Sequence, residues 1–333
     1  MRPTLLAIAG ALCCGAMTAS LAAQQPAPIG HSDSVLTLSD PTLLIEDLAW
    51  DARTTTWYLS SVHQRRILAI GRDGAIRDFV PAAGSGMWSP FAVALDTTRN
   101  LLWVATAATP EGLGTPKEDL GRTAVLAFEL GGGRLAARHE LPRLSTAQAL
   151  ADLALLDDGT VIVSDSRGGG LYALRPGQER LDVVVPPGTF RSPQGPAGIP
   201  GTHEVIVADY SRGLARVDRR TGAVTWFAPP GDFVLKGIDG IRLRGHTLIV
   251  VQNGVRPNRV ARLELDKRYD RIISAEILEA GTPGLSEPTH GTWVGDDFVF
   301  IANSGWAAMG ADGNFTAGAT LELPMLRRLR VPR

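Results

Sequence analysis

The segment Val205–Asp209 (VIVAD) is an apolar, β-branched run that ends in a carboxylate, and the chain repeats this pattern. The other copies, each ending in a small polar residue, are Trp57–Ser61, Leu102–Thr106, Val161–Asp165, Ile249–Asn253 and Val299–Asn303. Successive copies end 44 to 59 positions apart. A repeat of this length built from strand-forming runs is typical of a β-propeller, in which each repeat forms one blade. The sequence therefore predicts an all-β fold, a six-bladed propeller with four-stranded antiparallel blades.

A second, shorter repeat precedes each copy, and we interpret it as the innermost strand of the blade. Its copies are Glu46–Asp51, Phe91–Asp96, Ala151–Leu155, Ala197–Ile199, Asp239–Leu243 and His290–Trp293. Two outer strands are expected after each polar strand end, and in the last blade these are Ala319–Leu323 and Leu326–Val331. Because the last blade would otherwise keep an open edge, we expect Val35–Leu38 to close the ring. The segments Thr109–Arg122 and Trp306–Gly318 are predicted to be loops near a mouth of the channel.

The first residues are typical of a secretory signal peptide. Arg2 is followed by the apolar run Leu5–Ala16 and by the small residues of Ser20–Ala23. We therefore expect residues 1–23 to be a signal peptide, 24–39 an N-terminal arm with a possible closing strand, and 40–333 the propeller domain. The expected location is the periplasm or the exterior, after cleavage. Both cysteines lie in the predicted signal peptide, so the mature chain would have no thiol nucleophile.

The charge of the chain is balanced, with 33 Lys and Arg residues against 34 Asp and Glu residues. Because neither sign dominates, the composition does not indicate a nucleic-acid partner. After the predicted signal peptide, no apolar run has the length of a membrane span. We therefore expect a monomer that takes a small-molecule substrate or ligand.

The first residues of the innermost strands are, in blade order, Glu46, Phe91, Ala151, Ala197, Asp239 and His290. Blades five, six and one are neighbours in a closed ring, so Asp239, His290 and Glu46 are expected side by side. Two carboxylates and an imidazole are suited to hold a divalent cation. They are equally suited to form an acid–base pair, in which a carboxylate orients His290. A third interpretation is a hydrogen-bonded polar plug in the channel.

The polar residues that end the repeated strands have a structural explanation, because such side chains bond to nearby backbone groups and stabilise turns. Asn253 and Asn303 are the expected exceptions, since their blades also carry Asp239 and His290. We therefore count both as candidate metal ligands. Asp152 follows one of the innermost-strand positions, and regular strand alternation predicts that its side chain points away from the channel.

Glu46–Trp50, Asp239–Ile241 and the six-unit pattern resemble the gluconolactonase, senescence marker protein and luciferin-regenerating enzyme family. The resemblance implies a six-bladed propeller and, for many members, metal-dependent lactone hydrolysis. It also implies that a Glu of blade one, Asn residues of blades three and four and an Asp of blade five hold the metal. Glu46 and Asp239 match this pattern, whereas the two Asn positions fall on Ala151 and Ala197. His290 would then be a substitute ligand.

Two functions remain open at this stage. The first is hydrolysis of a small lactone or ester with a divalent metal (Ca²⁺, Mn²⁺, Mg²⁺ or Zn²⁺), with Asp239 or His290 as the proton acceptor. The second is a non-catalytic propeller that binds a ligand or a protein. Because two protein ligands rarely hold a catalytic metal, the first hypothesis requires His290, Asn253 or Asn303 near the two carboxylates.

Overall fold

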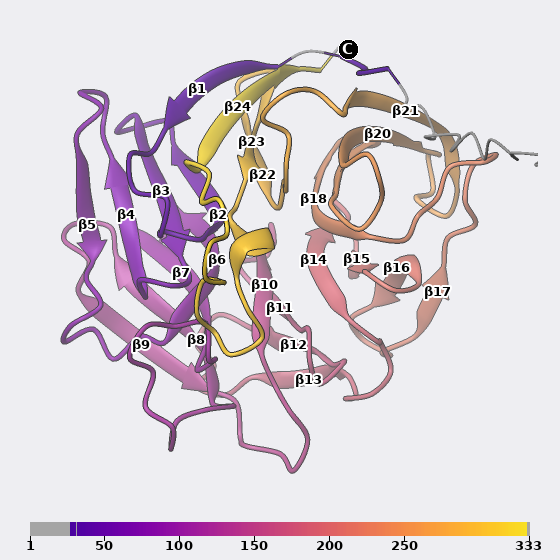
Figure 1. Cartoon of the computed structure of the whole chain (residues 1–333). Helices are drawn as coiled ribbons and strands as arrows, with labels where there is room; N and C mark the ends of the chain where they lie inside the picture. The colour runs from indigo at the N-terminus through magenta and orange to yellow at the C-terminus, as the bar shows by residue number, and fades with distance from the viewer. Residues whose placement is uncertain (1–26, 31, 332–333) are drawn as a thin grey trace, which may run out of the picture.

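The computed structural model describes residues 27–30 and 32–331, so the predicted signal peptide lies outside the described residues. The described chain forms six four-stranded antiparallel sheets arranged as blades around a central axis (Figure 1), which confirms the predicted fold. Among the described residues, no helix has the length and hydropathy needed to cross a membrane.

Five blades follow the chain from the innermost to the outermost strand. The first two blades comprise β2 (Ile45–Asp51), β3 (Thr56–Ser61), β4 (Arg66–Ile70), β5 (Ile76–Val80), β6 (Ser89–Asp96), β7 (Leu101–Ala107), β8 (Thr123–Glu129) and β9 (Leu135–Glu140). The next two comprise β10 (Leu150–Leu155), β11 (Val161–Asp165), β12 (Leu171–Leu174), β13 (Asp182–Val185), β14 (Pro193–Gly198), β15 (Glu204–Asp209), β16 (Gly213–Asp218) and β17 (Val224–Trp226). The fifth comprises β18 (Ile238–Arg244), β19 (Thr247–Gln252), β20 (Arg259–Leu265) and β21 (Ile272–Ala280).

The sixth blade joins the two ends of the propeller. Its strands are β22 (Gly291–Val294), β23 (Asp297–Asn303), β24 (Met325–Arg330) and, outermost, β1 (Asp33–Thr37). The expected closing strand is therefore present, and β1 pairs antiparallel with β24. The expectation of a strand at Ala319–Leu323 is wrong. Because β1 and β23 occupy both edges of β24, this segment has no strand to pair with and extends the preceding loop instead.

The hydrophobic core lies between neighbouring blades, which explains why the repeated strands are apolar on both faces. Every residue of β3, β11 and β23 except Asp297 is buried. One core cluster joins Ala92 and Trp103 of blade two to Leu153 and Val163 of blade three. Each second strand thus packs its two faces against the blades on either side, and the apolar runs bury in full only when the ring is complete.

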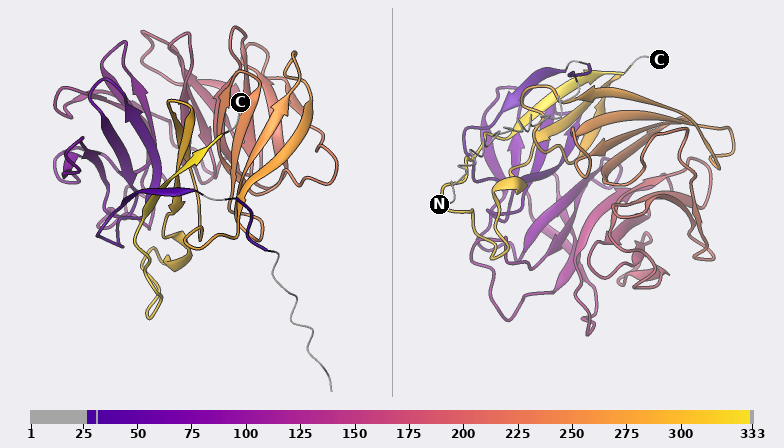
Figure 2. Two further views of the ribbon diagram at one scale, coloured as in Figure 1. Left: turned by 90° about the horizontal axis from the view of Figure 1, so that it is seen from above. Right: turned by 45° about the vertical axis from the view of Figure 1, so that its right-hand side comes forward.

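The loop between β23 and β24 projects from one face of the ring (Figure 2). It includes the short 3₁₀ helix η1 (Trp306–Ala308), which lies over the centre of the ring in Figure 1. The other predicted insertion contacts this loop. The His63 ring, next to that insertion, lies 4.8 Å from the Phe315 ring, and its Nδ1 lies 2.7 Å from the Glu111 carbonyl oxygen. Both insertions therefore gather at one end of the central channel.

Candidate metal centre

The innermost strands share a bulge near their first residue. In β2 the pairing register shifts between Ile45 and Leu48, and in β18 it shifts between Ile238 and Ile241. Corresponding shifts occur in β6, β10 and β14. A bulge places extra residues opposite the partner strand and changes the direction of their side chains. Glu46 and Asp239 both lie inside these bulges, which turn the two carboxylates towards the channel.

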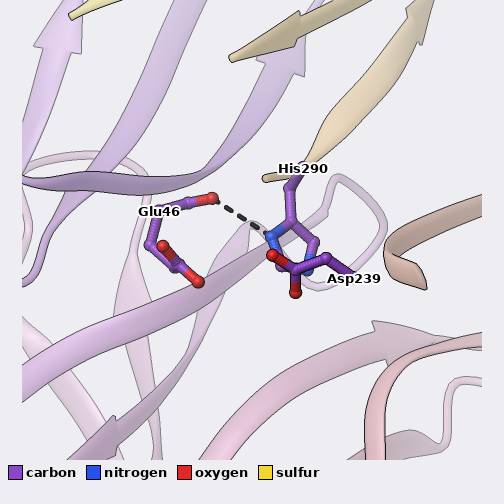
Figure 3. A group of neighbouring side chains, drawn as sticks. All are labelled: Glu46, Asp239 and His290. Carbon is purple, nitrogen blue, oxygen red and sulfur yellow. Dashed lines mark hydrogen bonds between the residues drawn. The ribbon is translucent and has the colours of Figure 1, made fainter. Parts of the chain in front are cut away.

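Glu46, Asp239 and His290 meet in the channel, as their positions on adjacent blades predict. Each offers a ligand atom, and these atoms all lie within 4.8 Å of one another. The side chains point towards one another in Figure 3. The three residues are 9%, 7% and 1% exposed, respectively. Two carboxylates held this close together away from water repel each other unless a positive charge lies between them.

His290 supplies one such charge. It directly precedes β22, and its Nδ1 lies 3.1 Å from the backbone carbonyl oxygen of Glu46 (Figure 3). Its Nε2 lies 2.8 Å from Asp152 Oδ1. Burial alone lowers the pKa of His290, but the Asp152 and Asp47 carboxylates outweigh this effect and raise the pKa well above its usual value. An oxygen atom therefore lies beside each ring nitrogen, and the Nε2 contact with Asp152 is an ion pair that lacks hydrogen-bond geometry.

The expectation that Asp152 points away from the channel is wrong. Asp152 is 3% exposed and lies against His290. The cause is the register shift between Leu150 and Leu153 in β10, which interrupts the regular alternation of side chains. The sequence contained a signal for this residue, because Asp152 occupies in blade three the position that Asp47 occupies in blade one.

The two candidate ligand carboxylates are difficult to ionise in the absence of a cation. Burial, together with the Asp239 charge, raises the pKa of Glu46 well above its usual value. Burial raises the pKa of Asp239 to about 7, although His290 and a hydrogen bond from Asn253 act in the opposite direction. A divalent cation would favour the ionised form of both groups.

Asn253 extends the group of oxygen atoms around Asp239. It follows the end of β19, and its Nδ2 donates to Asp239 Oδ2 at 2.6 Å. Its Oδ1 is buried without a hydrogen-bond partner, and so is Oδ2 of Asp152. These two oxygens add further hydrogen-bond acceptors beside the cluster of carboxylates. By contrast, Asn303 Nδ2 donates to the Leu323 carbonyl at 3.2 Å, which ties Asn303 to the blade-six loop.

Trp306 lies at the same centre, which the sequence did not indicate. Its indole Nε1 donates to Glu46 Oε2. The next residue, Ala307, donates its backbone N–H to Glu287. These two bonds hold η1 against the mouth of the site. Trp306 follows Glu46 by 260 positions in the chain. No local pattern could predict this contact, because it depends on how the long blade-six loop folds back.

The other polar strand ends stabilise backbone, as the structural explanation predicts. The hydroxyls of Ser61 and Thr106 donate to the carbonyls of Leu43 and Ser89. Asp165 accepts backbone N–H bonds from Ala149 and Gly168, and Asp209 accepts four such bonds. Of the six positions, Asn253 is thus the one whose side chain bonds to a candidate ligand.

The register also corrects the innermost position of blade four. The bulge of β14 spans Gln194 and Gly195, between Pro193 and Pro196. Gln194 therefore corresponds to Glu46, and the sequence-based choice of Ala197 is three residues too late. The error arose because the proline- and glycine-containing strand lacks the apolar pattern that marks the other innermost strands. Gln194 is partly buried, and its Nε2 donates to Ser192 Oγ at 2.9 Å.

A separate cavity of about 590 Å³ occupies the other end of the channel. It is lined by later residues of the innermost strands, such as Ala94, Leu155 and Leu243, and not by the Glu46 centre. The guanidinium of Arg242, on its wall, lies 3.1 Å from Oδ1 of the buried Asp47.

No protein-family model matches the chain, and no curated protein matches it. Solved structures do share its fold. A calcium-binding protein, regucalcin, from Agrobacterium tumefaciens is 16% identical, with a TM-score of 0.62 over 91% of this chain and 95% of that one. A gluconolactonase from Xanthomonas campestris is 18% identical, with a TM-score of 0.56 over 92% and 91%. Virginiamycin B lyase from Staphylococcus aureus is 13% identical, with a TM-score of 0.58 over 90% and 88%. The resemblance to the gluconolactonase and regucalcin group is therefore confirmed at the level of the fold.

Proposed function

We propose that this protein is a metal-dependent hydrolase of a small lactone or ester, and that it acts in the periplasm or outside the cell. The observation that carries the proposal is the buried group of Glu46, Asp239 and His290 together with the unpartnered oxygen of Asn253. The names of two structural neighbours, a gluconolactonase and a calcium-binding protein, support the same interpretation. The sequence features of residues 1–23 support the location.

The donor atoms fit a divalent cation. Glu46 and Asp239 supply carboxylate oxygens, and Asn253 Oδ1 is a buried amide oxygen that lacks a partner. Oxygen ligands of this kind suit Ca²⁺, Mg²⁺ and Mn²⁺. Zn²⁺ would require an imidazole ligand in addition, and both nitrogens of His290 already face oxygen atoms. We therefore assign the metal to Glu46, Asp239 and Asn253, with His290 beside them as a positive charge.

When bound, the cation would polarise a substrate carbonyl and lower the pKa of a water molecule. The protein's own residues have separate tasks. Asp239, whose ionised form the cation would favour, is suited to accept a proton from water. The Asn253 N–H fixes one oxygen of Asp239, and the Trp306 indole fixes one oxygen of Glu46. His290, whose ring nitrogens face the Glu46 carbonyl and Asp152, holds the bulge of β2 next to blade six and acts as a positioning residue.

Metal analysis of the mature chain tests this proposal. Elemental analysis and calorimetry should find one divalent cation per chain in the parent protein and at least a tenfold loss of affinity in Glu46→Gln and Asp239→Asn. Asn253→Ala should weaken binding, whereas Asn303→Ala should not. Asp78→Asn, on the outer strand β5, is the matched control for loss of a carboxylate. A panel of lactones followed by pH-stat titration should then show turnover that disappears with chelator.

Failure to bind Ca²⁺, Mn²⁺, Mg²⁺ or Zn²⁺ at millimolar concentration would overturn the proposal. The alternative is then a non-catalytic binding propeller. The cavity of about 590 Å³ favours that candidate, because its volume lies in the range of small-molecule sites. Filling it by Ala154→Trp would abolish ligand binding in that case, while leaving a hydrolase that acts at Glu46 unaffected.

A further inference from the structure

An aromatic pair lies beside the candidate metal centre. Phe91 lies in the bulge of β6, between Pro90 and Ala92, and thus holds in blade two the position that Glu46 holds in blade one. Its ring is stacked with that of Trp306, with 6.4 Å between ring centroids and 15° between ring planes. Both residues are partly exposed, so the pair presents aromatic surface and is not sealed in the core.

The pair is fixed directly to the reactive centre. The indole N–H of a partly buried Trp usually has an acceptor, and here the acceptor is a carboxylate oxygen of Glu46. The adjoining backbone is held by the bond from Ala307 to Glu287. Trp306 therefore borders any group that binds at Glu46, and Phe91 is stacked against Trp306.

The next blade reinforces the apolar character of this wall. In blade three the corresponding position is Ala151, which is 7% exposed and cannot form side-chain hydrogen bonds. Hydrogen-bonding side chains lie in blades four and five, at Gln194 and Asn253. Neither the Phe91 nor the Ala151 side chain can form a hydrogen bond, so the hydroxyl groups of a polyhydroxylated substrate find no partner in these two side chains. A flat apolar group would instead stack on the rings.

We propose that Phe91 and Trp306 determine the substrate class, and that the substrate is a lactone or ester carrying an aryl or other flat apolar group next to its carbonyl. The inference rests on the proposed hydrolase function. It distinguishes the site from one that selects a sugar lactone. Phe91 and Trp306 act here as specificity-determining residues, and the cation and Asp239 carry the reaction.

The kinetic test compares three lactones on the metal-loaded mature chain: dihydrocoumarin, γ-butyrolactone and glucono-δ-lactone. We expect kcat/KM for dihydrocoumarin to exceed that for glucono-δ-lactone at least tenfold. Phe91→Leu should reduce this ratio at least tenfold, mainly through KM, and Phe91→Tyr should restore it because the ring is retained. Phe233→Leu, a partly buried aromatic in the loop before β18, is the matched control. A preference for glucono-δ-lactone, or a ratio unchanged in Phe91→Leu, would overturn the inference.

An equilibrium measurement separates this inference from the proposed function. The ketone 2-tetralone has the shape of dihydrocoumarin but has no ester bond to hydrolyse, and its binding can be followed by calorimetry. Binding that weakens at least tenfold in Phe91→Leu and in Trp306→Leu supports the aromatic wall even if no lactone is turned over. If lactones are hydrolysed but 2-tetralone binds the parent and both variants equally, the hydrolase stands and the aromatic wall is refuted.

Discussion

Asp209 provides a quantitative test of how the polar strand ends stabilise the propeller. The side chain is fully buried at the end of β15. Its Oδ2 accepts N–H bonds from Arg191 and Ser192 at 2.6 and 3.3 Å, and its Oδ1 accepts N–H bonds from Ser211 and Arg212 at 2.9 and 3.0 Å. Both carboxylate oxygens are therefore needed to accept these four bonds. They connect the segment before β14, at Arg191 and Ser192, with the turn between β15 and β16.

The substitution Asp209→Asn replaces one of these acceptors by an NH₂ group. That group would face two backbone N–H donors, so two hydrogen bonds are lost and the donors are left without partners. Hydrogen bonds to charged groups contribute about 1.5–3 kcal/mol each. For two such bonds we therefore expect the free energy of unfolding to fall by about 3–6 kcal/mol, a large value for one nearly isosteric change. Urea unfolding followed by circular dichroism measures this loss from the midpoint and the m value.

Asp218 is the matched control for this experiment. It also accepts two backbone N–H bonds, from Arg220 and Thr221, but both are accepted by the same oxygen, Oδ1, in a partly exposed turn. Asn retains such an oxygen, so Asp218→Asn should change stability by less than about 0.5 kcal/mol. A loss below about 1 kcal/mol for Asp209→Asn, or equal losses for both variants, would refute the reasoning.

Three further predictions concern two buried carboxylates and the strand β1 that closes the ring of blades. Hydrogen bonds from Arg53 lower the pKa of Asp51, so the stability that Asp51 contributes is present above about pH 4 and is lost as pH falls through the folded-state pKa. The loss in free energy of unfolding that Asp51→Asn causes, measured by urea unfolding, should therefore be smaller at pH 3 than at pH 7. Asp152→Ala leaves the buried His290 cation without its partner and should lower the free energy of unfolding by about 3 kcal/mol. A chain that begins at Leu38 lacks β1 and exposes the edge of β24, so its Tm should fall by about 5 °C or more and its aggregation should increase.

Each of these predictions has a control. Asp78→Asn removes an exposed carboxylate of β5 that pairs with Arg66, and it should change the free energy of unfolding by less than about 1 kcal/mol. Asp157→Ala removes an exposed carboxylate in blade three and should leave stability within about 0.5 kcal/mol of the parent. A chain that begins at Ser32 retains β1 and should keep the parental Tm. Equal behaviour of variant and control in any pair would contradict the corresponding prediction.

The sequence by itself determined the six-bladed architecture and the proximity of Glu46, Asp239 and His290. Apolar runs such as Val205–Asp209 can bury both faces only between other sheets, so their repetition dictates a closed ring of blades. The order of blades in that ring then places Glu46, Asp239 and His290 side by side, as the structure shows. The closing strand followed from the same reasoning, because the last blade has a free edge that only a terminus can cover.

Only the tertiary structure decided which other side chains join the site. Strand alternation predicts that Asp152 faces away, but the bulge in β10 turns it towards His290, and the position of a bulge depends on pairing register. Register likewise placed Gln194, and not Ala197, in the ring of innermost positions. Trp306 reaches Glu46 through a loop whose path is determined by packing against other blades. Local sequence specifies strands, whereas these long-range contacts form only when all six blades are assembled.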